Sequence, residues 1–313
     1  MSKVSIIGAG NVGATIANAI ANMQFASDIV LLDIKEGIAE GKARDMMQTA
    51  KLYRYFTQVT GVTGDYTKTA NSDVIVITSG IPRKPGMTRE ELIETNAKIV
   101  SGVIEKALEY SPEAIFVIIS NPMDTMTYLT YKKSNLPKHR VIGMGGILDS
   151  SRFTDYLSLA LNVPSSDIEG LVIGGHSDTS MMPLVRFACY KSIPVTELLT
   201  KEELNKVVND TMVGGATLTK MLGTSAWYAP GAAAAVLVKA IMLNENKIYP
   251  CSVYLNGEYE QKDICTGVPV MIGKNGWKKI IDYKLNDEER ELFNKSCDSI
   301  RSVNNLLFEL NLI

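Results

Sequence analysis

The stretch VSIIGAGNVG, residues 4–13, decides the fold of this 313-residue chain. Residues 4–8 form a short apolar run typical of a strand, and residues 11–23 follow with the period of a helix. The turn between them has the pattern G-x-G-x-x-G, formed by Gly8, Ala9, Gly10, Asn11, Val12 and Gly13. In such a unit the glycines permit a tight turn, close approach of a pyrophosphate and packing of the helix on the strand. We therefore predict a dinucleotide-binding loop whose phosphates meet the N–H groups of the helix N-terminus.

An acidic residue ends the next predicted strand, residues 28–33. Asp33 lies 20 residues after Gly13, where a carboxylate accepts hydrogen bonds from ribose hydroxyls. The same carboxylate repels a 2′-phosphate, and Ile34 follows it where an arginine would accommodate that phosphate. We therefore expect NAD rather than NADP. The alternative is an ordinary glycine turn followed by a solvated aspartate.

Strand and helix patterns alternate through the rest of the first half. The runs at residues 73–79 and 114–120 are continuously apolar and rich in β-branched side chains, as in strands buried on both faces of a parallel sheet. We predict a further strand at 59–62 and helices at 36–49 and 90–110. This alternation predicts an α/β fold class, with an N-terminal Rossmann domain, a doubly wound parallel sheet, over residues 1–144.

The pattern changes after about residue 145. We predict helices at 148–162 and 201–221, strands at 169–173, 182–190 and 268–272, and a hairpin at 253–259. Asn286 is a plausible N-cap for a closing helix at 286–310, because Glu289 follows three residues later. These patterns predict a C-terminal α+β substrate domain at residues 145–313, packed tightly on the first domain with a cleft between them.

Composition excludes several classes of protein. Lys and Arg number 32 against 34 Asp and Glu, so the chain lacks the basic excess of a nucleic-acid binder. No apolar run is long enough to span a membrane, and the N-terminus does not resemble a signal peptide. The cysteines are scattered without a C-x-x-C pair: Cys189, Cys251, Cys265 and Cys297. We expect reduced thiols in a cytoplasmic protein, with no metal site and neither a nucleic-acid nor a membrane partner.

Any imidazole chemistry depends on two histidines. His176 lies in IGGHSD, residues 173–178, where glycines after an apolar run suggest a strand end that opens into a cleft. It is either a catalytic or a structural histidine. His139 lies in a polar loop between basic neighbours, and we expect it to be an exposed surface residue.

A carboxylate and a guanidinium share one helical face in LDSSRF, residues 148–153. Asp149 and Arg152 are three residues apart, so they form an intrahelical ion pair or perform separate tasks. In the second case Asp149 fixes the tautomer of His176 and Arg152 holds a substrate carboxylate with its bidentate fork.

Two polar segments follow the buried strands at the edge where α/β sheets bind ligands. IPRKPGMTR, residues 81–89, carries three cations in seven residues, which suits an anionic substrate or a solvated basic loop. Asn121 follows the second strand, where it either contacts a ligand or caps the next helix.

These segments in this order resemble the lactate/malate dehydrogenase family over essentially the whole chain, and most closely its lactate-dehydrogenase-like malate dehydrogenases. The resemblance implies an NAD-dependent enzyme that oxidises (S)-malate to oxaloacetate, a reaction of the tricarboxylic acid cycle, and that assembles as a homotetramer or homodimer. It implies that His176 is the proton acceptor and donor, Asp149 its partner, and Arg89 the group that polarises the substrate oxygen. By the same resemblance Arg83, Arg89, Asn121, Arg152 and Ser225 bind substrate, and Asn96 with Ile119, Ser120 and Asn121 lines the cofactor.

Arg83 sets the expected substrate class, because lactate enzymes of the family carry an uncharged residue there. A buried dicarboxylate needs two cationic partners, and pyruvate would leave one arginine unpaired. The alternatives are a lactate or other 2-hydroxyacid dehydrogenase, an NAD-dependent glycosidase, which would need a metal site, and a non-catalytic NAD-binding sensor.

Overall fold

Six parallel strands form the first part of the sheet. The computed structural model describes residues 2–82 and 87–313. These strands stand in the order β3-β2-β1-β4-β5-β6. The chain adds β2 and β3 on one side of β1 and then β4, β5 and β6 on its other side. Their bounds are β1 Lys3–Ile7, β2 Asp28–Asp33, β3 Gln58–Thr63, β4 Val74–Ile77, β5 Ile115–Ile118 and β6 Val141–Gly143. The carboxyl ends of β1 and β4 therefore flank a topological switch point, where such sheets bind ligands.

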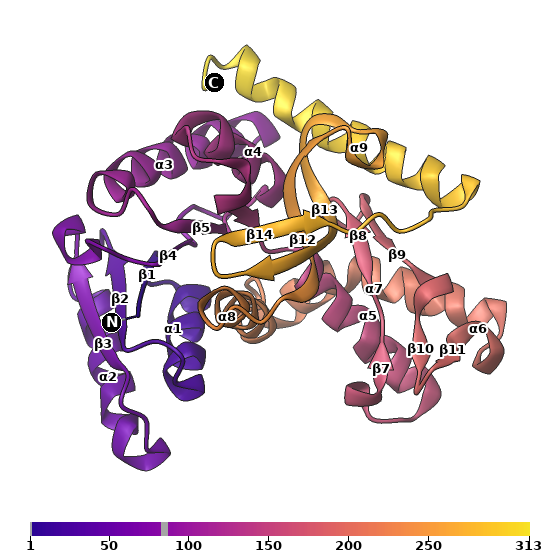
Figure 1. The fold of residues 1–313 in the computed structure, drawn as a ribbon, viewed down its shortest axis with the longest axis horizontal. Helices are drawn as coiled ribbons and strands as arrows, with labels where there is room; N and C mark the ends of the chain where they lie inside the picture. The colour runs from indigo at the N-terminus through magenta and orange to yellow at the C-terminus, as the bar shows by residue number, and fades with distance from the viewer. Residues whose placement is uncertain (1, 83–86) are drawn as a thin grey trace.

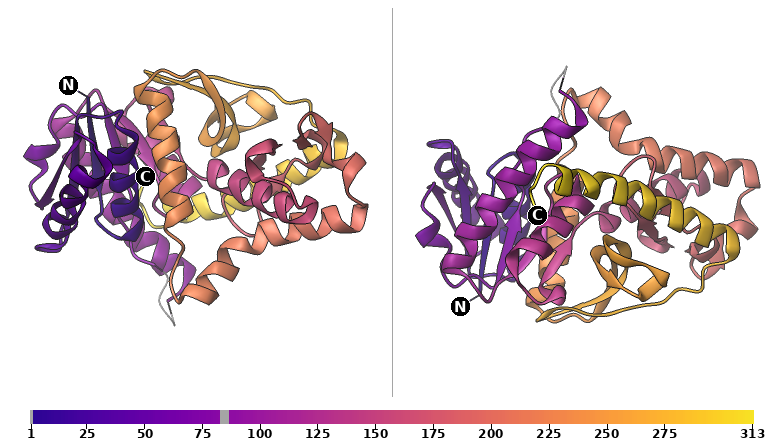
Figure 2. Two further views of the ribbon diagram at one scale, coloured as in Figure 1. Left: turned by 90° about the horizontal axis from the view of Figure 1, so that it is seen from below. Right: turned by 90° about the horizontal axis from the view of Figure 1, so that it is seen from above.

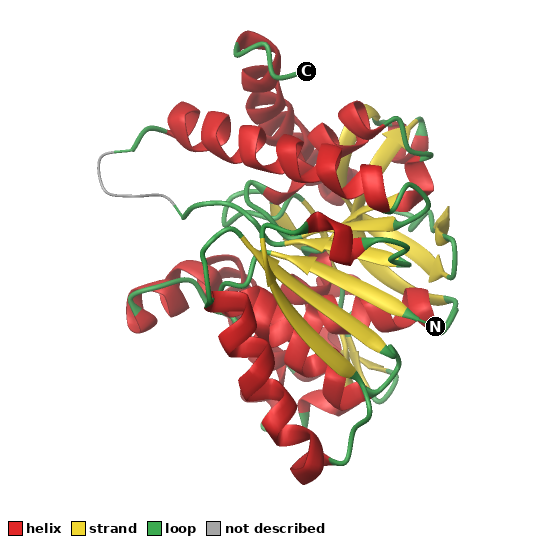
Figure 3. Ribbon diagram, turned by 90° about the vertical axis from the view of Figure 1, so that its left-hand side faces the viewer, coloured by secondary structure: helices red, strands yellow, loops and turns green. Residues whose placement is uncertain are grey.

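Helices cover both faces of this sheet (Figure 3). In the first half they are α1 Asn11–Met23, α2 Ile38–Tyr53, α3 Arg89–Tyr110 and α4 Met123–Ser134. Successive residues of β1 serve opposite faces, since Ile6 packs in the core that includes α1 and Ile7 in the core that includes α3. The two-sided burial explains why the predicted strands read as continuous apolar runs.

The second half contains short strands, one long hairpin and five helices in the part of the chain that the structure describes. The helices are α5 Gly146–Leu161, α6 Val195–Leu198, α7 Lys201–Leu222, α8 Tyr228–Met242 and α9 Asp287–Glu309. The strands are β7 Ile168–Glu169, β8 Val172–Gly174, β9 Met181–Pro183, β10 Cys189–Tyr190, β11 Ile193–Pro194, β12 Lys247–Asn256, β13 Lys262–Gly273 and β14 Gly276–Ile280. At α9, Asn286 and Glu289 form the predicted capping box.

Three predictions of strand length were wrong. The run at 169–173 is split into β7 and β8, which belong to different sheets. The run at 182–190 is not one strand, because β9 ends at Pro183, which cannot donate a ladder hydrogen bond, and a 3-10 turn spans Val185–Phe187. Arg186 on that turn reaches out to Glu289, with Nη2 2.7 Å from Oε2. The predicted hairpin turns near Gly257 as expected, but its strands β12 and β13 extend far beyond residues 253–259.

The two halves share one sheet of 11 strands. Strand β12 pairs with β6 through Ser252 and Gly143, and β13 pairs with β8 through Gly267 and Gly174. Helix α8 packs against α1, so a helix of the second half covers the first (Figure 1). Figure 2 shows the two halves side by side from two further directions. In the described part of the chain no helix has the length and apolar character to cross a membrane.

Candidate active site

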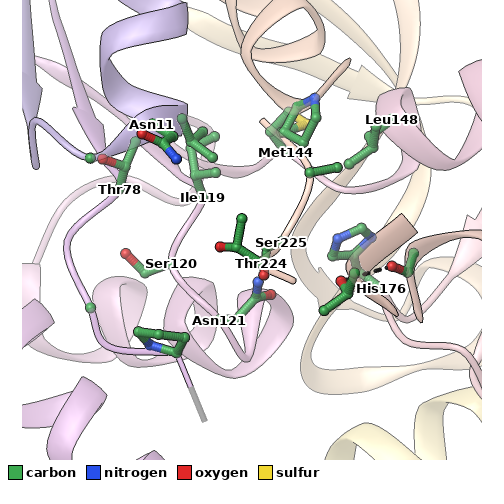
Figure 4. A pocket seen from close by; sticks show the side chains of 18 of the residues that line it. Asn11, Thr78, Ile119, Ser120, Asn121, Met144, Leu148, His176, Thr224 and Ser225 are labelled. Carbon is green, nitrogen blue, oxygen red and sulfur yellow. Dashed lines mark hydrogen bonds between the residues drawn. The ribbon is translucent and has the colours of Figure 1, made fainter. Parts of the chain in front are cut away.

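A cavity of about 480 Å³ lies where the carboxyl ends of the strands meet the second half. Residues from both halves line it, and Figure 4 shows many of their side chains around the space. The candidate residues on its wall are Gly10, Asn11, Val12, Gly13, Asn96, Ile119, Ser120, Asn121, Arg152, His176 and Ser225. The structure therefore brings most of the predicted site together from segments far apart in the sequence.

The glycine loop forms one end of this cavity. Gly8 has a φ of +112°, which side chains rarely adopt, and a Cβ on Gly13 would lie only 1.9 Å from the carbonyl oxygen of Gly8. Helix α1 begins at Asn11, and its N-cap Gly10 has no side chain to satisfy the first N–H groups. Those groups and the positive end of the helix dipole are left for an anion such as a pyrophosphate.

Asp33 lies beside the glycine loop at the end of β2. Its Oδ2 accepts a hydrogen bond from the backbone N–H of Ala9 at 2.7 Å, and its Oδ1 accepts one from Lys35 at 3.0 Å. Gly8, Ala9 and Asp33 are not among the residues that line the cavity. The carboxylate therefore holds the backbone of the glycine loop at Ala9.

Asn96 of α3 ties together the segments that follow β4 and β5. The Asn96 side chain is buried, with Oδ1 accepting from the N–H of Ile81 at 2.8 Å. Its Nδ2 donates to the carbonyl of Asn121 at 2.8 Å and to that of Ile81 at 3.2 Å. This side chain thus fixes the backbone on which Asn121 is presented to the cavity.

His176, Asp149 and Arg152 meet at the opposite end of the cavity. His176 follows β8, and its Nδ1 lies 2.7 Å from Oδ2 of Asp149 on α5. The other oxygen of Asp149 accepts from Nη1 of Arg152 at 3.2 Å. The Asp149 side chain is 2% exposed, whereas those of His176 and Arg152 are 17% and 15% exposed. Asp149 therefore bonds to His176 and Arg152 at the same time, so the ion pair and the histidine contact, which the sequence left as alternatives, are both present.

The surroundings of His176 favour its protonated form. Burial by itself would lower the pKa of His176, but the charge and hydrogen bond of Asp149 and the charge of Asp124 oppose it. Arg152 acts in the same direction as burial, and the net result is a raised pKa. An imidazole that is protonated over a wider pH range can act as an acid as well as a base near neutrality.

Of the predicted arginines, Arg89 is not in this group. Arg89 is the first residue of α3, is exposed, and is not among the residues that line the cavity. Arg83 lies outside the described residues. Arg152 does line the cavity, and Nη1 of its guanidinium is bonded to Asp149.

The expectation for His139 was wrong, because this residue is half-buried. Strand β14 crosses its main chain so closely that a Cβ on Gly276 would lie 1.9 Å from the carbonyl oxygen of His139. Burial lowers the pKa of His139, and the charge of Arg140 lowers it further. His139 does not line the candidate site.

One functional candidate escaped the sequence reasoning. Asp124 lies buried in the first turn of α4, and its Oδ2 accepts a hydrogen bond from the backbone N–H of His176 at 2.7 Å. An acid in the first turn of a helix is common, since it favours the helix dipole. The sequence signal that could have identified Asp124 as a site residue was its position three residues after Asn121, which was already a candidate. Within residues 2–82 and 87–313, no three His, Cys, Asp or Glu side chains are grouped to hold a metal ion.

A nucleotide-type glycine loop and a histidine–aspartate pair at two ends of one cavity define an α/β oxidoreductase site. Residues 2–143 match the NAD-binding domain of lactate/malate dehydrogenases, and residues 147–310 match the alpha/beta C-terminal domain of the same enzymes. The chain belongs to the lactate/malate dehydrogenase family.

Individual relatives extend this likeness over the full chain. A malate dehydrogenase of Parabacteroides distasonis is 62% identical over 99% of this chain and 99% of its own. The solved malate dehydrogenase of Salinibacter ruber is 40% identical, with a TM-score of 0.94 over 99% of this chain and 98% of its own. A Cryptosporidium parvum lactate dehydrogenase, solved with lactic acid and nicotinamide adenine dinucleotide, is 35% identical, with a TM-score of 0.93 over 98% of each chain.

Proposed function

We propose that this chain catalyses the reversible NAD-dependent oxidation of (S)-malate to oxaloacetate. The observation that carries the proposal is the 2.7 Å contact between Nδ1 of His176 and Oδ2 of Asp149, in a cavity that also holds Arg152 and the glycine loop. The 62% identity to a malate dehydrogenase over the whole chain supports this substrate over pyruvate or lactate.

His176 moves the proton of the reaction. Because Nδ1 carries the hydrogen that bonds to Asp149, Nε2 keeps a free lone pair that can accept the malate hydroxyl proton. Asp149 then stabilises the imidazolium that forms, and in the reverse direction the same imidazolium returns the proton to the substrate oxygen. When NAD is bound, its nicotinamide accepts the hydride that leaves C2 of malate and donates it back in reduction.

Arginines hold the dicarboxylate. Arg152 binds the carboxylate adjacent to the reacting carbon, because its side chain lines the cavity and its guanidinium is held in place by Asp149 through Nη1. We assign the second carboxylate to Arg83 and the polarisation of the substrate oxygen to Arg89. Asn121 and Ser225, which line the same cavity, contact the bound substrate. Two cations are needed because a buried dianion without paired charges is strongly unfavourable.

The residues present fit NAD. The crowded approach of Gly13 to Gly8 and the uncapped start of α1 form a phosphate cradle that a side chain would fill. We assign the pyrophosphate to Gly8, Ala9, Gly10, Asn11, Val12 and Gly13, the ribose to Asp33, and the nicotinamide side to Asn96, Ile119, Ser120 and Asn121. The carboxylate of Asp33 favours NAD over NADP.

We further propose a boundary between a NAD-binding domain at residues 1–144 and a catalytic domain at 145–313, since β6 ends at Gly143 and α5 begins at Gly146.

We propose assembly into a homotetramer or homodimer, because Leu52, Tyr53 and Phe56 are exposed together at the end of α2 and beyond it. Sedimentation equilibrium tests that assembly. A cytoplasmic location is supported by the four free cysteines.

A substrate panel tests the function. Oxaloacetate and pyruvate are compared as oxidants of NADH and NADPH, and we expect the highest kcat/KM for oxaloacetate with NADH. Arg83→Gln is expected to lose activity on oxaloacetate and gain activity on pyruvate. His176→Asn is expected to abolish turnover and to leave NADH binding near normal. A wild-type preference for pyruvate would contradict the assigned substrate, whereas NADH binding without turnover of any four-carbon acid would favour a sensor.

A further inference from the structure

A second carboxylate lies next to the catalytic histidine. Asp124 is 6% exposed and lies in the first turn of α4, three residues after Asn121. Its Oδ2 accepts the backbone N–H of His176 at 2.7 Å, a short and well-formed hydrogen bond. His176 is therefore held from two helices, its ring by Asp149 of α5 and its main chain by Asp124 of α4.

Asp124 has few other contacts in the fold besides its place in the first turn of α4. Its other oxygen, Oδ1, has no hydrogen-bond partner of ordinary geometry among the described residues, and neither has the hydroxyl of Ser252 that faces the carboxyl group. No described Lys or Arg pairs with it, since Arg152 is directed to Asp149. A buried carboxyl group without a cation lowers the stability of a fold, and a role in the reaction would explain why this one is buried here.

We propose that Asp124 is a positioning residue for the reaction, whose carboxyl oxygen holds the main chain of His176 so that the imidazole stays between Asp149 and the cavity. The proposal rests on the function proposed above. Because α4 begins shortly after Asn121, its first turn connects Asn121, a candidate substrate contact, through Asp124 to His176, the proton-transfer group. A displacement of about 1 Å at a reacting group can lower a rate by about 100-fold, so such a hold has kinetic consequences.

The groups that face His176 determine which variants are informative. They are Asp149 and Arg152 from α5, Asp124 from α4 and Asp178 on its own loop, which lines the same cavity. Asp124→Asn keeps an oxygen that can accept the N–H of His176. Asp124→Ala removes the acceptor, and Asp124→Leu removes it while preserving the branched shape. Thr130→Val is the matched control, because Thr130 is buried on the same helix and its hydroxyl donates to the carbonyl of Met126 one turn earlier.

The test measures kcat for oxaloacetate reduction per NADH-binding site, so that unfolded protein does not count. We expect Asp124→Ala and Asp124→Leu to lose about tenfold to 100-fold in kcat while the Kd for NADH changes by less than about threefold. Asp124→Asn is expected to recover most of that loss, and Thr130→Val to keep the wild-type kcat per site. A purely structural role would lower the melting temperature of the alanine and leucine variants and leave their kcat per site unchanged, which would overturn the proposal.

Hydrogen–deuterium exchange on the wild-type protein gives an answer even where a variant does not fold. The N–H of His176 is expected to exchange slowly, because it is bonded to a buried carboxyl oxygen. Exchange as fast as that of the exposed Asp178, whose N–H has no hydrogen-bond partner among the described residues, would contradict the proposed contact. If the wild-type enzyme showed no turnover of oxaloacetate but a protected His176 amide, the assigned reaction would fail while the contact itself stood.

Discussion

Replacing Asp149 by asparagine removes one charge from the centre of the candidate site and keeps its shape. Oδ2 of Asp149 lies 2.7 Å from Nδ1 of His176, and Oδ1 lies 3.2 Å from Nη1 of Arg152. An amide offers one oxygen and one NH₂ group, so it cannot accept from both partners. Either His176 takes the other tautomer or the guanidinium of Arg152 loses its anion.

The geometry sets the size of the effect. Removing one member of a buried ion pair costs about 3–5 kcal/mol, and Asp149 is 2% exposed, so little solvent compensates. If this cost falls on the imidazolium of His176, kcat/KM for oxaloacetate reduction drops by about 200-fold to about 5,000-fold. The loss of the carboxylate also lowers the pKa of His176, so the alkaline limb of the reduction profile moves to lower pH.

The assay follows NADH consumption with oxaloacetate across a pH series, with NADH affinity measured separately by fluorescence titration. Asp155→Asn is the matched control, since it makes the same change on the exposed face of the same helix, and we expect wild-type kinetics. Asp149 does not line the cavity, so the Kd for NADH is expected to stay within about threefold. An Asp149→Asn enzyme with near wild-type kcat/KM and an unmoved pH profile would refute the reasoning.

Four further predictions concern protons, the glycine loop and the cofactor. In the wild-type enzyme, reduction needs protonated His176, so its rate should fall as pH rises through the raised pKa while malate oxidation rises; pH profiles in both directions check this sign. Gly13→Ala should lower the free energy of unfolding by about 3 kcal/mol or more, measured by thermal melting, because the new Cβ meets the carbonyl oxygen of Gly8. Gly10→Ala, where nothing lies within 4 Å of the new Cβ, should melt normally and bind NADH more weakly. Asp33→Ser should raise the ratio of NADPH to NADH activity in a two-cofactor assay, and an unchanged ratio would argue against its role.

Local signals predicted much of the first half. Strands β4 and β5 were recognisable because all of their residues are buried, so apolarity alone marks them. The start of α9 was recognisable because its capping box depends only on Asn286 and Glu289. The glycine loop was readable for the same reason, since its turn and its helix packing are properties of adjacent residues.

Features that depend on contacts between distant segments could not be predicted from the sequence. The join of β12 to β6 depends on Ser252 meeting Gly143, and no local pattern encodes that pairing. The break after Pro183 depends partly on Arg186 finding Glu289 near the end of the chain. Asp124 looked like an ordinary acid of a first helical turn, because its bond to His176 spans 52 residues of sequence. From the residues alone, the contact between Asp149 and His176 was one of two alternatives, and the resemblance of whole motifs favoured it.

The shared sheet changes how the boundary near residue 144 should be understood. A chain cut there would leave β6 without β12 and α1 without α8, which exposes an unpaired strand edge and an apolar helix face to water. Each half thus completes the hydrophobic core of the other, and heating should melt the subunit in a single cooperative transition. The glycine loop and His176 also follow strands of one continuous sheet, β1 and β8, so the distance between them is set by that sheet rather than by a hinge between separately moving lobes.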